Sequence, residues 1–154
     1  MFKKIAGKTK IMYFGKDTTE QTRDGSLVTF NLDSGQVVRV GNDSDDKIVG
    51  VVRRADTLAD SGGTGGVPVE VAVESAVEYE VETDSDGGAA DSDRGRIVAI
   101  DTTGGNSVNA GDSAGMRVDV SDSVAGSFLI TRVISATRVR GVIVNTVFHQ
   151  TFDT

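Results

Sequence analysis

The chain has 154 residues, enough for one domain with a modest core, and its hydrophobic content of 38% and aromatic content of 5% are low for a large one. It contains no cysteine, which excludes a disulfide framework and a thiolate metal site. No run of about 18 consecutive apolar residues is present, which excludes a membrane-spanning helix.

The charge is distributed unevenly along the chain. The formal net charge is −7, but residues 1–16 hold five of the six lysines and no acid, so the remaining chain carries −12. A negative surface repels phosphate, so we expect no nucleic-acid partner. The basic segment is suited to an acidic protein surface, including that of a neighbouring copy. The alternative is a solvated, disordered tail.

The N-terminal segment lacks the apolar run of a signal peptide, which predicts a protein made in the cytoplasm and not secreted. After it, composition changes to short Val- and Ile-rich runs separated by Gly, Asp, Asn and Ser. We therefore divide the chain into a basic N-terminal arm over residues 1–16 and a single β-rich domain over residues 17–154.

The strands are expected where apolar residues alternate with polar ones. Residues 17–23 are the best candidate for a helix, and they are a weak one. About eight to ten short strands at this spacing predict an all-β fold, a small antiparallel β-barrel or sandwich. The runs that predict strands are 27–32, 36–40, 47–54, 67–82, 96–101, 116–120, 128–135 and 138–148.

Three local features refine this pattern. Gly35 follows Asp33 and Ser34 in a tight turn, which predicts a hairpin over residues 27–40 and a positive φ at the glycine. Gly50 interrupts a strand and marks a bulge or a close approach of two backbones. Residues 67–82 alternate Val with Glu, which predicts a half-buried sheet with one apolar face and one row of carboxylates.

One segment resembles the nucleophile elbow of hydrolases. Gly-Asp-Ser-Ala-Gly over residues 111–115 fits G-x-S-x-G, and Asp119 or Asp122 and then His149 follow in the hydrolase order. The elbow requires a helix after Ser113, whereas residues 116–120 read as a strand. An ordinary Gly-rich turn explains the segment better.

The remaining polar motifs are no stronger. Asp101-Thr102-Thr103-Gly104 has one threonine too many for the Asp-Thr-Gly loop of aspartic proteases, and a lone histidine makes no transition-metal site. Two groups of aspartates could gather Ca²⁺ or Mg²⁺ weakly but miss the EF-hand pattern. We therefore expect no enzyme, no cofactor and no metal. The aspartate groups are Asp43, Asp45 and Asp46, and Asp84, Asp86, Asp91 and Asp93.

The order of the β segments resembles the capsid decoration (cement) proteins of tailed viruses. The resemblance is carried by Gly-Gln-Val-Val-Arg-Val-Gly (35–41), Ile-Val-Gly-Val-Val (48–52), Val-Pro-Val-Glu-Val-Ala-Val-Glu-Ser-Ala-Val-Glu-Tyr-Glu-Val (67–81) and Arg-Gly-Val-Ile-Val (140–144). The acidic loop over residues 83–94 and the lysine-rich arm depart from the compact members of that family.

The resemblance implies a structural virion protein on the capsid exterior, without a membrane partner. It implies binding to the major capsid protein after head expansion, often as a homotrimer, so that neighbouring capsomers are held together. The alternatives are another virion or surface β module, such as a tail component or a glycan-binding domain, and then a small hydrolase. We expect the capsid contacts to be Phe2, Lys3, Lys4, Lys8, Lys10, Tyr13 and Phe14, unless this segment docks on its own domain.

Overall fold

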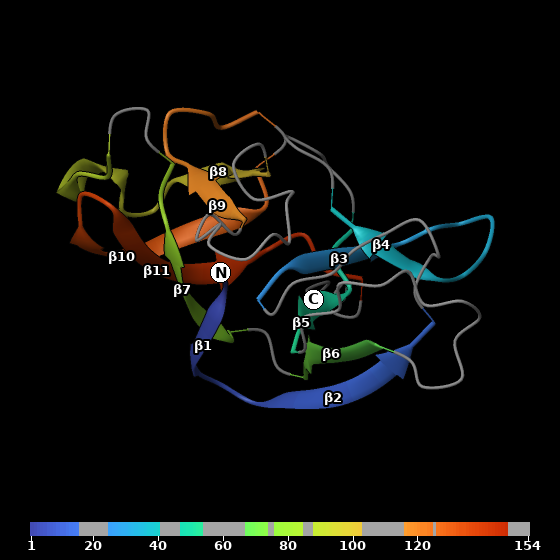
Figure 1. Cartoon of the computed structure of the whole chain (residues 1–154). Helices are drawn as coiled ribbons and strands as arrows, with labels where there is room; N and C mark the ends of the chain where they lie inside the picture. Colours follow the sequence, from blue (N-terminus) through green and yellow to red (C-terminus); the bar gives the residue numbers. More distant parts are fainter. Residues whose placement is uncertain are drawn as a thin grey trace, which may run out of the picture.

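The computed structural model describes residues 1–15, 25–40, 47–53, 67–73, 76–84, 88–102, 116–124 and 126–147. These residues form eleven strands and one short 3₁₀ turn, η1 (Asp91–Asp93), with no α-helix among them. The strands make two antiparallel sheets, whose strands occupy different sides of the view in Figure 1. The prediction of an all-β fold is confirmed. The arrangement is sandwich-like and not a closed barrel.

Sheet A has six strands, and it curls on itself. Thr83, just after the second strand, forms a parallel bridge with Val118 of the last strand, and the Asp84 amide donates to the Val118 carbonyl at 3.0 Å. This contact partly protects the far edge of the sheet. In spatial order the strands are β1 (Lys3–Ala6), β7 (Glu78–Glu82), β11 (Arg138–Ile143), β10 (Phe128–Ser135), β8 (Ile97–Asp101) and β9 (Arg117–Asp119).

Sheet B has five strands and contains the predicted hairpin. Gly35 has a φ of 69°, and its amide donates to the Asn31 carbonyl at 2.8 Å, so the turn is confirmed. The bridge between Ile48 and Thr146 links this sheet to the chain that follows β11. In spatial order the strands are β2 (Thr9–Phe14), β6 (Val67–Ala72), β5 (Gly50–Val52), β3 (Leu27–Phe30) and β4 (Val37–Arg39).

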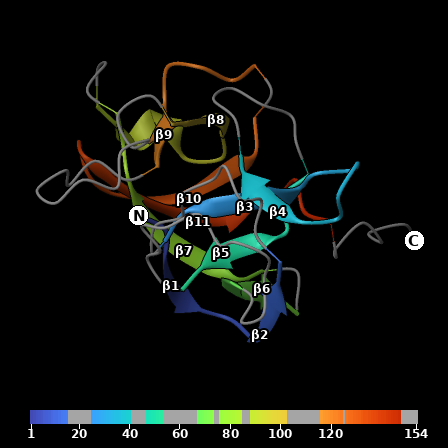
Figure 2. The same ribbon diagram turned by 45° about the vertical axis from the view of Figure 1, so that its right-hand side comes forward.

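The main hydrophobic core joins the two sheets. Leu27 and Val51 contribute to it from sheet B, and Tyr79, Ile100 and Phe128 are among its members from sheet A. Because successive side chains of a strand point to opposite faces, the next residues, Val28 and Val52, belong to a second cluster on the other face of sheet B. Sheet B is therefore apolar on both faces. Figure 2 shows the two sheets from a second direction.

The segment 67–82 differs from its prediction. It forms two strands in different sheets, β6 in sheet B and β7 in sheet A. Val69 and Val71 are buried as expected, but Val73 is exposed and Glu70 is only 7% exposed. Glu70 is not part of a solvated carboxylate row because its face of sheet B is turned toward sheet A, where it meets Lys4 and Tyr79.

Two glycines permit close approach of neighbouring strands. A Cβ on Gly50 would collide with the Glu70 carbonyl oxygen, which confirms the predicted close approach. A Cβ on Gly141 would collide with the Leu129 carbonyl oxygen and the Phe128 ring. The strands expected over 96–101, 116–120 and 128–135 are present as β8, β9 and β10. The strand expected over 138–148 is present as β11, which ends at Ile143. The helix candidate 17–23 lies outside the described residues.

Candidate interaction surface

The basic N-terminal segment supplies an edge strand to each sheet. β1 pairs with β7 and ends sheet A, whereas β2 pairs with β6 and ends sheet B. Gly7 lies between them with a φ of 100°, a left-handed conformation that glycine adopts without strain. Figure 1 shows the two strands in blue, along the lower side of the molecule. Residues 3–14 of the predicted arm are therefore paired with the body of the protein.

The seven predicted contact residues divide into two phenylalanines that pack within the protein and an exposed group. Phe2 is 0% exposed, and its ring packs edge to face on Phe128 with the centroids 5.7 Å apart. Phe14 is half-buried and packs in the same manner on Phe30, at 5.4 Å. These two rings face the interior of the protein. The remaining five, Lys3, Lys4, Lys8, Lys10 and Tyr13, are exposed.

The exposed residues of β1 and β2 combine positive charge with apolar surface. The side chain of Tyr13 is 68% exposed and that of Ile11 is 42% exposed. Ile11 was missed by sequence reasoning, because only the topology shows that its strand ends a sheet. Exposed apolar side chains next to cations are suited to protein contacts, since burial supplies affinity and charge supplies selectivity. We call this surface the basic edge: Lys3, Lys4, Lys8, Lys10, Ile11 and Tyr13.

A buried ion cluster lies beneath the basic edge. Glu70, opposite Ile11 in the register of β6 and β2, accepts a hydrogen bond from the Arg53 guanidinium at 2.6 Å. The Lys4 ammonium lies 3.8 Å from the same carboxylate. Arg53 also donates to the Phe2 carbonyl at 3.2 Å. The cluster thus ties the N-terminal residues to sheet B.

Tyr79 completes this cluster from sheet A. Burial, together with the negative charge of Glu70 and a hydrogen bond to it, raises the pKa of the Tyr79 phenol far above its ordinary value, and the charge of Arg53 opposes the shift only in part. The phenol therefore remains protonated and donates to Glu70. Through Lys4, Tyr79 and Arg53, the Glu70 carboxylate of β6 therefore links β1 and β7 of sheet A to sheet B.

The described residues do not include a complete Ser-Asp-His set of the kind that the hydrolase hypothesis requires. Ser113 and His149 lie outside them. Asp119 accepts from the backbone amide and hydroxyl of Ser121 and from the amide of Asp122, and Asp122 accepts from the Val124 amide. These two carboxylates therefore stabilise the turn after β9.

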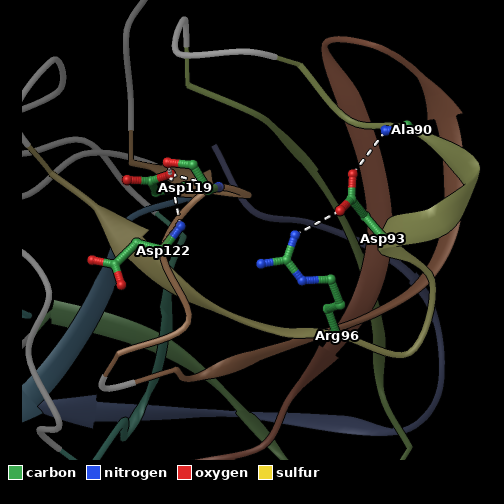
Figure 3. A network of polar contacts seen from close by, with 6 residues as sticks. Ala90, Asp93, Arg96, Asp119 and Asp122 are labelled. Atoms are coloured by element: carbon green, nitrogen blue, oxygen red, sulfur yellow. Dashed lines mark hydrogen bonds and ion pairs between the residues drawn. The ribbon is translucent and has the colours of Figure 1, made fainter.

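The described residues contain no cluster of acidic side chains of the kind that the cation hypothesis requires. Asp43, Asp45, Asp46 and Asp86 lie outside the described residues, and within these residues no three acidic or histidine side chains gather as metal ligands do. Asp93 is engaged elsewhere: it accepts from the Ala90 amide at 2.8 Å and from Arg96 at 2.7 Å, as Figure 3 shows. These bonds, that to Ala90 first, lower the pKa of Asp93 below its ordinary value.

This shift predicts an acid-dependent stability term. Because the folded pKa of Asp93 is lowered, its contribution is complete above the unfolded value of about 3.9 and is lost as the pH falls through the folded value. Asp93→Asn is expected to cost about 1 kcal/mol at pH 7 and to cost less as the pH falls below about 4. Urea unfolding of the wild type and the variant at pH 7 and at a pH below about 4 measures the two costs. Asp91→Asn, an exposed neighbour, is the control, and a cost that does not change with pH would refute the assignment.

Comparison with known proteins adds no further constraint. No family model matches the chain, and no curated protein or solved structure matches it either. The described residues include no helix with the length and hydropathy that crossing a membrane requires.

Proposed function

We propose that this protein binds the outer surface of a tailed-virus capsid and stabilises the expanded head, with the basic edge as its contact surface. The major capsid protein is the partner in this proposal, and a homotrimer is the working form. Both follow from the family resemblance of the β segments. The function is structural and involves no catalysis or cofactor.

The observation that carries the proposal is the basic edge itself. Four exposed lysines, Lys3, Lys4, Lys8 and Lys10, lie on two consecutive strands and the turn between them, while the chain beyond residue 16 has a net charge of −12. This charge asymmetry directs one side of the molecule toward an acidic partner and repels that partner from the rest.

The strands also reduce the cost of binding. A disordered arm would lose conformational entropy when it docks, whereas the backbone of residues 3–6 and 9–14 is already fixed by pairing with β7 and β6. A protein that must hold neighbouring capsomers against internal pressure benefits from a contact surface that is rigid before it binds.

Binding to shells tests the proposal. Expanded heads from the virus that encodes the chain, prepared without this protein, are mixed with it and sedimented. We expect the wild-type protein to sediment with the heads and to raise the temperature at which they rupture. Lys8→Glu/Lys10→Glu is expected to weaken binding by about tenfold or more, because two attractive charges become repulsive.

A matched variant controls for net charge. Lys47→Glu/Arg94→Glu changes the charge by the same amount at two exposed residues outside the basic edge, and it is expected to bind as the wild type does. Equal loss of binding in both variants would mean that only the net charge of the protein matters, and it would contradict the role of the basic edge. A wild-type protein that does not sediment with the heads would refute the proposal.

A further inference from the structure

β2 is the most extended unpaired edge in the described part of the fold. It has six residues, against four in β1 and three each in β4 and β9, the other strands that end a sheet. β6 lies on one side of it and no described strand lies on the other. An edge of this length presents backbone donors and acceptors to a further strand.

The side chains of β2 define what such a strand must carry. Ile11 and Tyr13 lie on one face, in register with Glu70 and Pro68, and Lys10 lies on the opposite face. When a strand pairs with β2, the side chains of two directly paired residues project from the same face of the sheet and contact each other. Apolar side chains are therefore required opposite Ile11 and Tyr13, and an acidic side chain opposite Lys10.

We propose that the β2 edge takes up an extended acidic segment of a partner protein as an additional strand of sheet B, with acidic and apolar residues in alternation. The inference deepens the proposed function, on which it rests for the identity of the partner as a shell protein. The backbone bonds supply affinity, and the alternation of side chains supplies selectivity.

Charge favours an acidic partner over a second copy of this edge. Two β2 strands side by side would bring together two segments that each contain Lys3, Lys4, Lys8 and Lys10 and no acid. Lysines on an exposed edge strand oppose pairing of identical edges in this way. The same lysines attract a strand with carboxylates.

A synthetic peptide isolates this contact from the rest of the shell. The probe is fluorescein-labelled Val-Asp-Val-Asp-Val-Asp-Val, and its binding to the full chain is followed by fluorescence anisotropy. We expect it to bind about tenfold or more tightly than Val-Val-Asp-Asp-Asp-Val-Val, which has the same charge without the alternation. Lys10→Glu is expected to weaken binding and to favour a peptide with Lys in place of Asp, whereas Lys47→Glu changes neither.

Backbone methylation then separates strand addition from charge attraction. An added strand presents every second amide to β2, so N-methylation of either the Asp amides or the Val amides must abolish binding, while methylation of the other set leaves it. Equal binding of the scrambled peptide, or no effect of either methylation, overturns the proposal. So does concentration-dependent dimerisation of the protein alone that amide exchange maps to β2, since a second copy would then occupy the edge.

The two proposals fail separately. Heads that bind the wild type in a Lys10-dependent way, with no binding of the alternating peptide, would overturn the strand addition and leave the capsid function standing. Peptide binding without any binding to heads would overturn the capsid function.

Discussion

Phe2→Ala is expected to destabilise the fold by about 3–5 kcal/mol, the range for removal of a buried phenylalanine ring. Phe2 is 0% exposed, lies in the main core and packs on Phe128. Removal of the ring leaves a cavity between the sheets. The substitution also weakens the attachment of β1, which begins at the next residue, Lys3. The expected result is a large fall in the urea midpoint with an unchanged slope.

Tyr13→Ala is the matched control for this variant. It removes an aromatic ring from the same N-terminal segment, but the ring is 68% exposed, so the expected change is within about 0.5 kcal/mol. Equal midpoints for the two variants would mean that Phe2 does not belong to the core. A full cost for Phe2→Ala alone is the result expected if the N-terminal end of the chain packs with the domain through Phe2.

Glu70→Ala is expected to have the second-largest effect, about 3 kcal/mol. The substitution leaves Arg53, whose side chain is 22% exposed, without its carboxylate, and it removes the acceptor of the buried Tyr79 phenol. The loss is at the low end of the range for a broken buried ion pair, because Arg53 keeps its bond to the Phe2 carbonyl and some access to water. Urea unfolding measures it.

Glu80→Ala provides the comparison for Glu70. Glu80 also meets two cations, Arg140 at 3.0 Å and Arg138 at 3.6 Å, but these arginines are more exposed than Arg53. The expected cost is therefore about 1 kcal/mol or less. If Arg53→Met is added to Glu70→Ala, part of the loss should be recovered, since the cation that lost the Glu70 carboxylate is removed as well. A cost for Glu70→Ala no larger than that for Glu80→Ala would contradict the buried cluster.

The strands of the domain could be predicted because their signal is local. β10 and β11 are rich in β-branched and other apolar residues, and the turn at Gly35 needs only a few neighbouring residues. The assignment of strands to sheets is not local. β6 and β7 read as one continuous pattern, and nothing within residues 67–82 states that the two strands belong to different sheets.

The N-terminal segment shows the limit most clearly. Four of residues 3–10 are lysines, and this composition is typical of a solvated tail, so it hides the strand pattern of Thr9–Phe14. Phe2 became a predicted contact because its burial depends on Phe128, more than a hundred residues away in the chain. Glu70 was placed in a solvated row for the same reason: Arg53, Lys4 and Tyr79, which permit its burial, are brought to it only by the tertiary fold.

Amide hydrogen exchange of the protein on expanded heads shows whether the basic edge is the surface that binds the capsid. The free and head-bound forms are compared strand by strand. We expect added protection in β2 (Thr9–Phe14), with little change in β4 (Val37–Arg39) at the opposite edge of sheet B. Protection confined to β4 or β9, with β1 and β2 exchanging as in the free protein, would rule this out.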